Sequence, residues 1–191
     1  ILKTNIFNDQ SKQKALKVAE KHYDLGNDLF LLFLDPYNQY SCAYFKNTKN
    51  INKAQEQKLD LICKKLYLKS TDKVLDIGCG WGGFAKYAAT KYGCSVTGIT
   101  ISEEQAEYAR NFTKGLPVEI IVQDYRDLKG KYDKIVSVGM IEHVGHKNYK
   151  IFMKKVNSLL KDEGLFLLHT IGAYDSKTTL EPWTNKYIFP N

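Results

Sequence analysis

The chain has 191 residues, of which 43% are hydrophobic and 26% charged, and this composition predicts one globular domain with a sizeable core. No apolar run is as long as a membrane span, no signal peptide is visible, and the four cysteines lack Cys-x-x-Cys or metal-finger spacing, so a reducing cytoplasm is the expected location and no metal is expected. The net charge of +7 favours an anionic partner, but arginine is scarce, which favours a phospholipid surface over nucleic acid unless the lysine-rich composition has no binding role.

Residues 1–70 are predicted to form an N-terminal helical cover that belongs to the same domain as the rest of the chain. We expect a polar helix over residues 9–21, a short helix over residues 30–34 capped by Asn27 or Asp28, and an amphipathic helix over residues 52–66. Residues 37–45 are irregular and rich in aromatic rings. Such a loop either covers an apolar or π-active ligand or is pinned to the core by its own rings.

Residues 71–191 show apolar strands that alternate with helices. Strands are expected over residues 74–77, 95–99, 119–122, 134–138 and 165–170, and helices over residues 84–89, from Ser102 onward and over residues 147–160. Ser102 and Gln105 have the spacing of a capping box. Repeated strand–helix units predict an α/β fold with a mostly parallel sheet, helices on both faces, and ligands at the carboxyl ends of the strands.

A glycine-dense turn, Gly78-Cys-Gly-Trp-Gly-Gly83, lies between the first of these strands and a helix. Glycine allows backbone angles that are closed to other residues and lets a ligand approach the main chain. The helix that follows presents unpaired N–H groups to the turn. Four glycines in six residues are dense for an ordinary strand–helix turn, and they predict a nucleotide-type ligand.

Gly78, Gly80 and Gly83 satisfy the dinucleotide fingerprint, which makes a nicotinamide dinucleotide one candidate ligand. Two features weigh against it. Asp76 stands before the first glycine, where it would be awkward beside a pyrophosphate, and the second strand ends at Thr100 instead of an acid. Both suit S-adenosylmethionine, which carries a sulfonium, an ammonium and a ribose but no phosphate.

Polar residues also follow the other strands. Ser102 and Gln105 offer a hydroxyl and an amide where a ribose-binding acid is usual. Asp124 could accept a hydrogen bond from an adenine amino group, and the ring of Tyr125 could stack on the base. A turn-forming role for Asp124 is an equally good explanation of that residue taken by itself.

Eight motifs, in chain order, resemble the cyclopropane fatty acid synthases and the mycolic acid cyclopropane synthases, which are class I methyltransferases that use S-adenosylmethionine. Each motif alone is weak evidence, whereas the ordered set spans nearly all of the chain from His22 onward. The motifs are His22-Tyr-Asp-Leu-Gly-Asn-Asp28, Gln39-Tyr-Ser-Cys-Ala-Tyr44, Val74-Leu-Asp-Ile-Gly-Cys-Gly-Trp-Gly-Gly83, Thr100-Ile-Ser102, Gln123-Asp-Tyr-Arg-Asp127, Val138-Gly-Met-Ile-Glu-His-Val-Gly145, His169-Thr-Ile-Gly172 and Trp183-Thr-Asn-Lys-Tyr-Ile-Phe-Pro190.

The resemblance implies that residues 71–191 form a Rossmann-like core that binds S-adenosylmethionine. The implied cofactor-binding residues are Tyr40, Ser41, Asp76, Gly78, Cys79, Gly80, Trp81, Gly82, Thr100, Ser102, Gln105, Asp124 and Tyr125. The resemblance further implies methyl transfer to a cis double bond in an unsaturated phospholipid acyl chain, after which a bound bicarbonate removes a proton and a cyclopropane ring closes. The bicarbonate site of the family corresponds to Cys42, Glu142, His169 and Ile171, and the rings of Tyr40, Tyr44 and Phe45 could stabilise the cationic intermediate.

Each catalytic candidate has a simpler explanation. Glu142 could begin a helix, His169 could be a satisfied histidine at a strand end, and Cys42 could be a small buried hydrophobe. Many family members also have an N-terminal lipid-binding region and a C-terminal part that supplies a tyrosine to the bicarbonate site. Neither is found in this sequence, so we expect the chain to bind the cofactor and to have an incomplete lipid pocket.

Three functions therefore stay open: a cyclopropane-forming methyltransferase, a related methyltransferase for another olefin or an amine, and a cofactor-binding module without activity. Nucleic-acid methylation is disfavoured because Gly139-Met-Ile-Glu142 stands where the Asp/Asn-Pro-Pro-Tyr signature would follow the fourth strand. The expected partner is a membrane lipid at the inner face of the cell membrane, and the complete protein is expected to form a homodimer.

Overall fold

The structure is a computed structural model that describes residues 27–172, 174 and 183. The helix expected over residues 9–21 lies outside the described residues. So do residues 22–26 of the first family motif and residues 184–190 of the last one.

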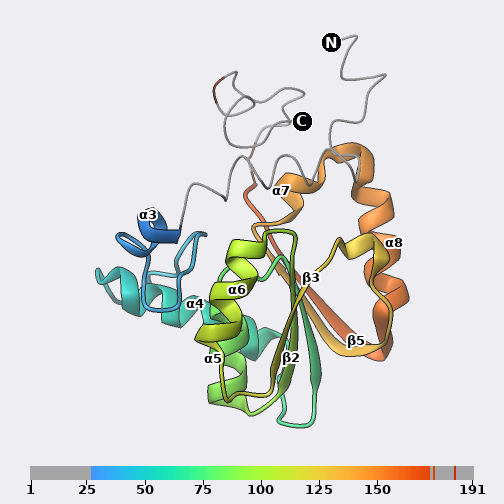
Figure 1. Ribbon diagram of the computed structural model, residues 1–191, viewed down its shortest axis with the longest axis horizontal. Coiled ribbons are helices and arrows are strands. Elements are labelled where there is room, and N and C mark those ends of the chain that lie inside the picture. The colour runs from blue at the N-terminus through green and yellow to red at the C-terminus, as the bar shows by residue number, and fades with distance from the viewer. Residues whose placement is uncertain (1–26, 173, 175–182, 184–191) are drawn as a thin grey trace.

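The described residues form one five-stranded sheet in the order β3-β2-β1-β4-β5 (Figure 1). Every neighbouring pair is parallel, which confirms the predicted α/β fold. The chain builds outward from β1 in both directions, so the strand order reverses between β1 and β4, where ligands of such sheets bind. The strands are β1 (Lys73–Ile77), β2 (Ser95–Thr100), β3 (Val118–Val122), β4 (Tyr132–Val138) and β5 (Leu160–His169).

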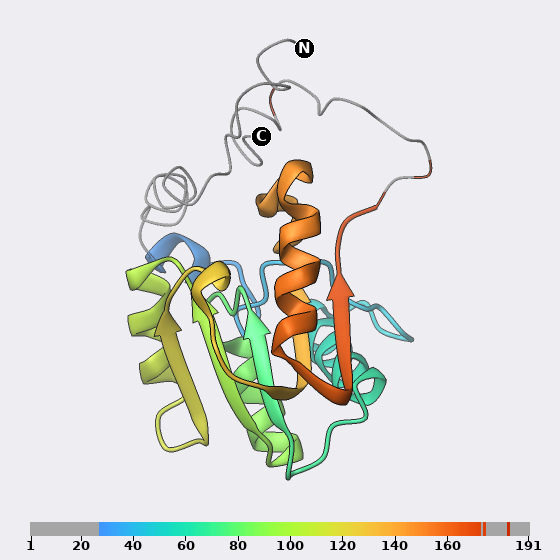
Figure 2. The same ribbon diagram turned by 90° about the vertical axis from the view of Figure 1, so that its right-hand side faces the viewer.

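Helices cover both faces of the sheet (Figures 1 and 2). On one face α4 (Ile51–Lys65) and α5 (Gly83–Tyr92) pack with Val74 and Val136 into a first core cluster. On the other face α8 (Tyr149–Leu159) packs on Leu75 and Ile135. This division follows from strand geometry, because consecutive side chains point to opposite faces. The helix α6 (Glu103–Phe112) covers β2 and β3 on the α5 side through Ala106 and Ala109.

The short helix α3 (Asn27–Leu31) lies earlier in the chain than the expected range 30–34, and Asn27 and Asp28 fall within the helix. The side chain of Asn27 is already engaged: its Oδ1 accepts from Nε1 of Trp81 at 2.6 Å, and its Nδ2 donates to the carbonyl of Glu104. After the helix, the carboxylate of Asp35 accepts from the N–H groups of Tyr37 and Gln39, which folds residues 35–39 into a compact turn.

The capping box before α6 is only half formed. The hydroxyl of Ser102 accepts from the N–H of Gln105, as predicted, but the Gln105 side chain does not return to Ser102. The N–H of Ser102 donates instead to Oγ1 of Thr100, and Thr100 donates to Oε1 of Gln105. A third polar residue at the end of β2 thus takes the role that the pattern gave to Gln105.

Two other boundaries differ from expectation. A 3-10 turn, His146–Asn148, occupies the start of the helix expected from residue 147, so α8 begins at Tyr149. The fifth strand was expected from residue 165 but begins at Leu160, because Leu160 already pairs with Tyr132 before a register shift. In the part of the chain that the structure describes, no helix has both the length and the apolar character needed to cross a bilayer.

Candidate functional site

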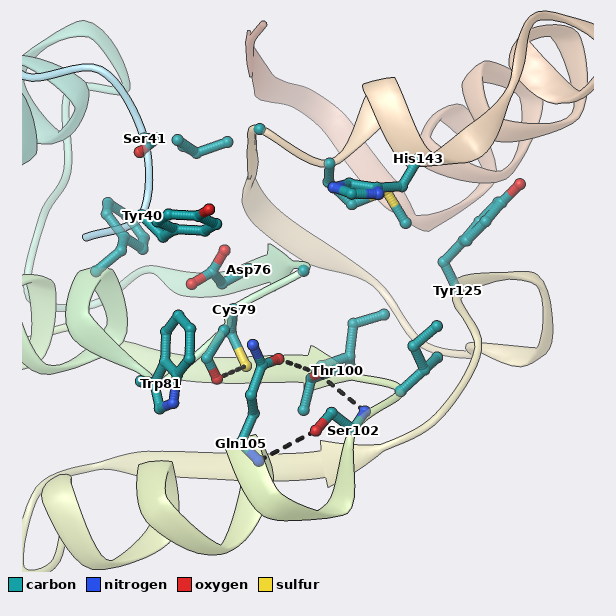
Figure 3. Close-up of a pocket in the computed structure, with 18 of the residues that line it drawn as sticks. Tyr40, Ser41, Asp76, Cys79, Trp81, Thr100, Ser102, Gln105, Tyr125 and His143 are labelled. Atoms are coloured by element: carbon teal, nitrogen blue, oxygen red, sulfur yellow. Dashed lines mark hydrogen bonds between the residues drawn. The ribbon is translucent and has the colours of Figure 1, made fainter. Parts of the chain in front are cut away.

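A pocket of about 190 Å³ opens at the carboxyl ends of β1, β2 and β4 (Figure 3). The structure brings twelve of the thirteen predicted cofactor-binding residues to this pocket. The lining residues are Asn38, Gln39, Tyr40, Ser41, Asp76, Gly78, Cys79, Gly80, Trp81, Phe84, Ile99, Thr100, Ile101, Ser102, Gln105, Gln123, Asp124, Tyr125, Arg126, Val138, Gly139, Met140, His143 and Val144.

The glycine turn forms the floor between β1 and α5. Gly78 and Gly80 have positive φ angles of 85° and 53°, which L side chains rarely adopt. The N–H groups of Gly78 and Cys79 both donate to the carbonyl of Ile99, so the turn is tied to the end of β2. A Cβ on Gly80 would meet no atom within 4 Å, so the main chain there borders open space that a ligand can occupy.

Gly82 is the one predicted cofactor residue that does not line the pocket. It caps α5 with a φ of 81°, and a Cβ at this position would lie 3.0 Å from the Cβ of Ala109 in α6. Its neighbour Gly83 is crowded more severely, because a Cβ would lie 1.7 Å from the carbonyl oxygen of Tyr37. These two glycines let helix α6 and the aromatic loop pack against the start of α5.

Asp76 is the acid of the pocket. Its carboxylate points into the cavity, although the residue is only 3% exposed (Figure 3). Burial raises the pKa of this carboxyl to about 7. Within the described residues no donor reaches the carboxylate, so it is available to the ammonium and hydroxyl groups of a ligand.

Thr100, Ser102 and Gln105 form a buried polar group beside Asp76 (Figure 3). Three hydrogen bonds of 2.9–3.2 Å connect their side chains and main-chain N–H groups, so each side chain is held in one orientation. Hydroxyl and amide groups fixed in this way can exchange hydrogen bonds with a ribose.

Asp124 both lines the pocket and forms a turn. Its Oδ1 accepts from the N–H of Arg126 at 2.8 Å and caps the 3-10 helix Tyr125–Asp127, while Oδ2 pairs with the Arg126 guanidinium at 3.0 Å. The ring of Tyr125 points away from the cavity and packs edge-on against Phe152, with centroids 5.2 Å apart (Figure 3). Tyr125 lines the pocket, but its ring is therefore not placed to stack on a base there.

The aromatic loop borders the pocket, and its rings also pin it to neighbouring elements. Tyr40 is 57% exposed and lines the pocket. The centroid of its ring lies 5.3 Å from that of Phe30, and the Phe30 centroid lies 4.8 Å from that of Trp81. Helix α4 secures the main chain of the loop, because Nε2 of Gln55 donates to the carbonyls of Gln39 and Ser41.

A second polar group lies where α7 (Ile141–Val144) meets the end of β5. Oε1 of Glu142 accepts from the main-chain N–H of Ile171 at 2.8 Å and from the hydroxyl of Thr170 at 2.9 Å. Oε2 of Glu142 and Nδ1 of His169 are buried and have no hydrogen-bond partner among the described residues. Buried polar atoms nearly always have a hydrogen-bond partner in a folded protein, so these two atoms are candidates for contact with a bound water or ion.

The structure describes the surroundings of each of these candidate residues. Glu142 does lie in a short helix, and its carboxylate also bonds the segment that follows β5. His169 is not satisfied at Nδ1, and its pKa is lowered first by burial and then by the charge of Lys58.

Cys42 is exposed, so it is not a small buried hydrophobe. Ser41, the residue before Cys42, lies near the end of β4, since a Cβ on Gly139 would lie 3.8 Å from its Cβ. The N–H of Gly139 donates to the carbonyl of His169, so the loop that carries Cys42 approaches the end of β5.

Several pocket residues were missed at the level of sequence. His143 projects from the segment after β4 (Figure 3), and Met140 of the same segment lines the pocket with it. Asn38 is a further lining residue, and its Nδ2 donates to the hydroxyl of Tyr108. A signal for the first two was present, because the end of β4 adjoins β1 at the point where the strand order reverses. Nothing in the local sequence marks Asn38. In the described ranges no group of three or more His, Cys, Asp or Glu residues could hold a metal ion.

The chain resembles known proteins along most of its length. A family model described as "Mycolic acid cyclopropane synthetase" matches residues 10–191. Cyclopropane-fatty-acyl-phospholipid synthase of Escherichia coli K12 is 56% identical over 186 residues, which make up 97% of this chain and 49% of that protein. The chain therefore spans about half the length of this relative.

Two solved structures resemble the fold. The cyclopropane synthase MmaA2 from Mycobacterium tuberculosis superposes with a TM-score of 0.83 at 33% identity, over 92% of this chain and 68% of that one. Mycolic acid cyclopropane synthase CmaA1 complexed with SAH and CTAB gives a TM-score of 0.77 at 36% identity, over 80% of this chain and 55% of that one. The fold is thus that of a class I S-adenosylmethionine-dependent methyltransferase, and the chain belongs to the mycolic acid cyclopropane synthetase family.

Proposed function

We propose that this chain is the catalytic core of an S-adenosylmethionine-dependent methyltransferase that adds a methylene group across the cis double bond of an unsaturated phospholipid acyl chain. The observation that carries the proposal is that two chain segments each contribute one residue to the cofactor pocket and a neighbouring residue to the predicted bicarbonate site. Ser41 lines the cofactor pocket and Cys42 follows it, while His143 lines the pocket and Glu142 precedes it. A methyl donor and a base would therefore lie side by side.

The pocket residues fit S-adenosylmethionine. Asp76 offers an unpartnered carboxylate to the ammonium group, and Thr100, Ser102 and Gln105 offer oriented groups to the ribose. The open main chain at Gly80 leaves room for the ligand. The related CmaA1 was solved with SAH, the species that remains after S-adenosylmethionine gives up its methyl group. When bound, S-adenosylmethionine supplies an electrophilic methyl group.

The residues around Glu142 fit bicarbonate. Oε2 of Glu142 can accept a hydrogen bond from a hydroxyl, and His169 has an unused ring nitrogen. Thr170 and the N–H of Ile171 hold the Glu142 carboxylate in place from its other oxygen, so the unpartnered oxygen has a fixed position. When bound, bicarbonate supplies a base that is not a side chain. The protein's task is to place this base and keep water from competing with it.

Aromatic side chains beside the pocket suit a cationic reaction. Tyr40, Tyr44 and Phe45 are all exposed on the loop that borders both sites. Aromatic faces stabilise a nearby cation, and an alkene is a weak nucleophile that needs placement more than activation. We assign these rings to the acyl chain and to the positive charge that develops on it.

We further infer that the protein meets its lipid at the inner face of the cell membrane. Leu32 is 84% exposed and Phe33 lies beside it, both directly after α3, and the net charge is +7. Apolar side chains together with positive charge favour an anionic lipid surface.

The experiment supplies the complete protein with methyl-labelled S-adenosylmethionine and vesicles of cis-unsaturated phospholipid, with and without bicarbonate. Label that appears as a ring methylene in the lipid, at a rate that rises with bicarbonate, supports the proposal. Label in an open-chain methyl branch or in an amine would assign the chain to a different acceptor. Equal turnover in bicarbonate-free buffer would reject bicarbonate as the base.

A further inference from the structure

Lys58 is buried in the middle of α4, with only 3% of its surface exposed. It is the one buried lysine among the described residues. Among the residues that the structure describes, its ammonium donates one hydrogen bond, to Oγ of Ser41 at 2.7 Å. An ammonium group has three donors, and within the described part of the chain no carboxylate lies close enough to form an ion pair with it.

The charged and titratable groups around Lys58 come from several elements. Asp35 precedes the aromatic loop, Cys42 lies within it, and His169 ends β5. Both oxygens of Asp35 already accept main-chain N–H groups, from Tyr37 at 2.9 Å and Gln39 at 2.7 Å. Both oxygens of the Asp35 carboxylate are therefore used by the main chain of the loop, and two of the three Lys58 N–H groups have no acceptor among the described residues.

Ser41, which accepts from the Lys58 ammonium, lies near the end of β4, because a Cβ on Gly139 would lie 3.8 Å from the Cβ of Ser41. The N–H of Gly139 donates to the carbonyl of His169 at 3.0 Å. Glu142 already interacts electrostatically with His169, and so does Lys58. If bicarbonate binds beside Glu142, a carboxylate and an anion share a partly buried site. Such a pair is stable only when a cation or several donors compensate it.

We propose that Lys58 is an anion-positioning residue of the bicarbonate site, which it serves by compensating the charge of the bound anion and by holding Ser41 and Cys42 against it. This inference rests on the proposed function, because it assumes that bicarbonate binds near Glu142 and His169. Burial lowers the pKa of Lys58 to about 8, so the group keeps its positive charge at neutral pH.

The competing explanation is structural. Lys58 would then only balance Asp35 inside the N-terminal cover, and its removal would weaken the fold without changing how the anion binds. The two explanations differ in one measurable quantity, which is the affinity for bicarbonate at constant fold stability.

The test uses the complete protein and measures the rise of the midpoint of thermal unfolding with bicarbonate concentration, in carbon-dioxide-free buffer and at constant ionic strength set with chloride. A ligand that binds the folded state raises this midpoint according to its affinity. We expect Lys58→Gln to weaken bicarbonate binding at least tenfold and Lys58→Arg to restore it to within about threefold of the original. If Lys58→Gln does not fold, Lys58→Met keeps the side-chain volume without the charge.

Lys53→Gln is the matched control. Lys53 lies on the same helix, is exposed and pairs with Glu56 at 2.8 Å, so its removal should leave the bicarbonate affinity unchanged. The half-saturating bicarbonate concentration for turnover should rise in Lys58→Gln by the same factor as the dissociation constant. The affinity for S-adenosylhomocysteine should fall by a clearly smaller factor than the affinity for bicarbonate, whereas a general collapse of the loop would lower both alike.

The outcomes separate this inference from the proposed function. If the original protein responds to bicarbonate and Lys58→Gln responds with the same affinity, the role of Lys58 is wrong and the proposed function stands. If the original protein shows no response in unfolding or in turnover, bicarbonate is wrong and the role of Lys58 is rejected with it. A tenfold loss that Lys58→Arg does not restore would also reject the charge-based role.

Discussion

Oε1 of Glu142 accepts a hydrogen bond from the main-chain N–H of Ile171 at 2.8 Å, and this contact joins α7 to the segment that follows β5. The other carboxylate oxygen is left buried and without a partner among the described residues. One oxygen thus anchors the side chain, and the second oxygen is presented at a fixed position.

Removal of this carboxylate should therefore damage turnover more than cofactor binding. We expect Glu142→Ala to lower kcat on cis-unsaturated phospholipid vesicles by at least about 100-fold, the scale of a lost acid–base or positioning group. The dissociation constant of S-adenosylhomocysteine, measured by calorimetry, should change less than about threefold. Glu107→Gln, on the exposed side of α6, is the control and should leave both quantities unchanged. A large loss of cofactor affinity would show that Glu142 belongs to the cofactor pocket.

His169→Ala should resemble Glu142→Ala in turnover, and it should also change the acid dependence of stability. Burial and Lys58 lower the pKa of His169 below its ordinary value, so the unfolded chain binds the proton more readily than the folded chain. This contribution destabilises the fold as the pH falls through 6.5 and below. Urea unfolding between pH 7.5 and 5 should show a flatter profile for the variant. An unchanged profile would contradict the assigned environment of the imidazole.

Asp76→Asn should raise the free energy of unfolding of the ligand-free protein and lower its affinity for S-adenosylmethionine. The folded-state pKa of about 7 lies above the ordinary carboxyl value near 4, so burial of Asp76 costs little below pH 4 and costs most above pH 7. The variant should gain up to about 4 kcal/mol in the free energy of unfolding at pH 8, and this gain should shrink as the pH falls toward 4. S-adenosylmethionine affinity should fall at least about 100-fold, because the ammonium loses its counter-charge. A variant that is less stable at pH 8 would mean that Asp76 has donors in the ligand-free state.

Gly83→Ala should disrupt the contact between α5 and the aromatic loop. The new Cβ would lie 1.7 Å from the carbonyl oxygen of Tyr37, so the loop main chain has to move. We expect a loss of at least about 2 kcal/mol in the free energy of unfolding, on the scale of overpacking in a core. Gly172→Ala, where a Cβ would meet nothing within 4 Å, should stay within about 0.5 kcal/mol. Equal stability of the two variants would show that the loop is not seated as described.

Membrane binding should depend both on salt and on the exposed residues after α3. We expect vesicle binding, measured by co-sedimentation with anionic phospholipid, to weaken severalfold between 50 mM and 300 mM salt, because surface charge is screened over such a range. Leu32→Gln should weaken it further. Tyr67→Gln is the control, since Tyr67 is 73% exposed but lies after the C-terminal end of α4 and not after α3. Vesicle binding that does not change with salt concentration would contradict a role of the net charge in membrane binding.

The sheet and the glycine turn could be predicted because each produces a pattern among residues that are close together in sequence. Apolar runs mark strands, and the spacing of Gly78 and Gly80 marks a turn with positive φ. Strand ends at Thr100 and Asp124 pointed to the pocket for the same reason, since parallel strands end at one edge.

The orientation of individual side chains was not predictable in this way. Tyr125 stands at the right strand end, but its ring turns to Phe152, and only the packing of α8 determines that choice. The side chain of Gln105 accepts from Thr100 and does not return to Ser102, because Thr100 at the end of β2 lies within hydrogen-bond distance, which the pattern alone could not show. Lys58 looks like any lysine on an amphipathic helix until the fold brings Ser41 over it, seventeen residues away in sequence.

The adjacency of Ser41 to Cys42 and of His143 to Glu142 has a thermodynamic consequence. A ligand that restrains one residue of such a pair also restrains its neighbour, because consecutive residues share a peptide unit. Cofactor and bicarbonate should therefore influence each other's affinity, and by linkage the factor must be the same in both directions. If the coupling is positive, saturation of either site raises the affinity of the other, so both ligands would be bound before the acyl chain arrives.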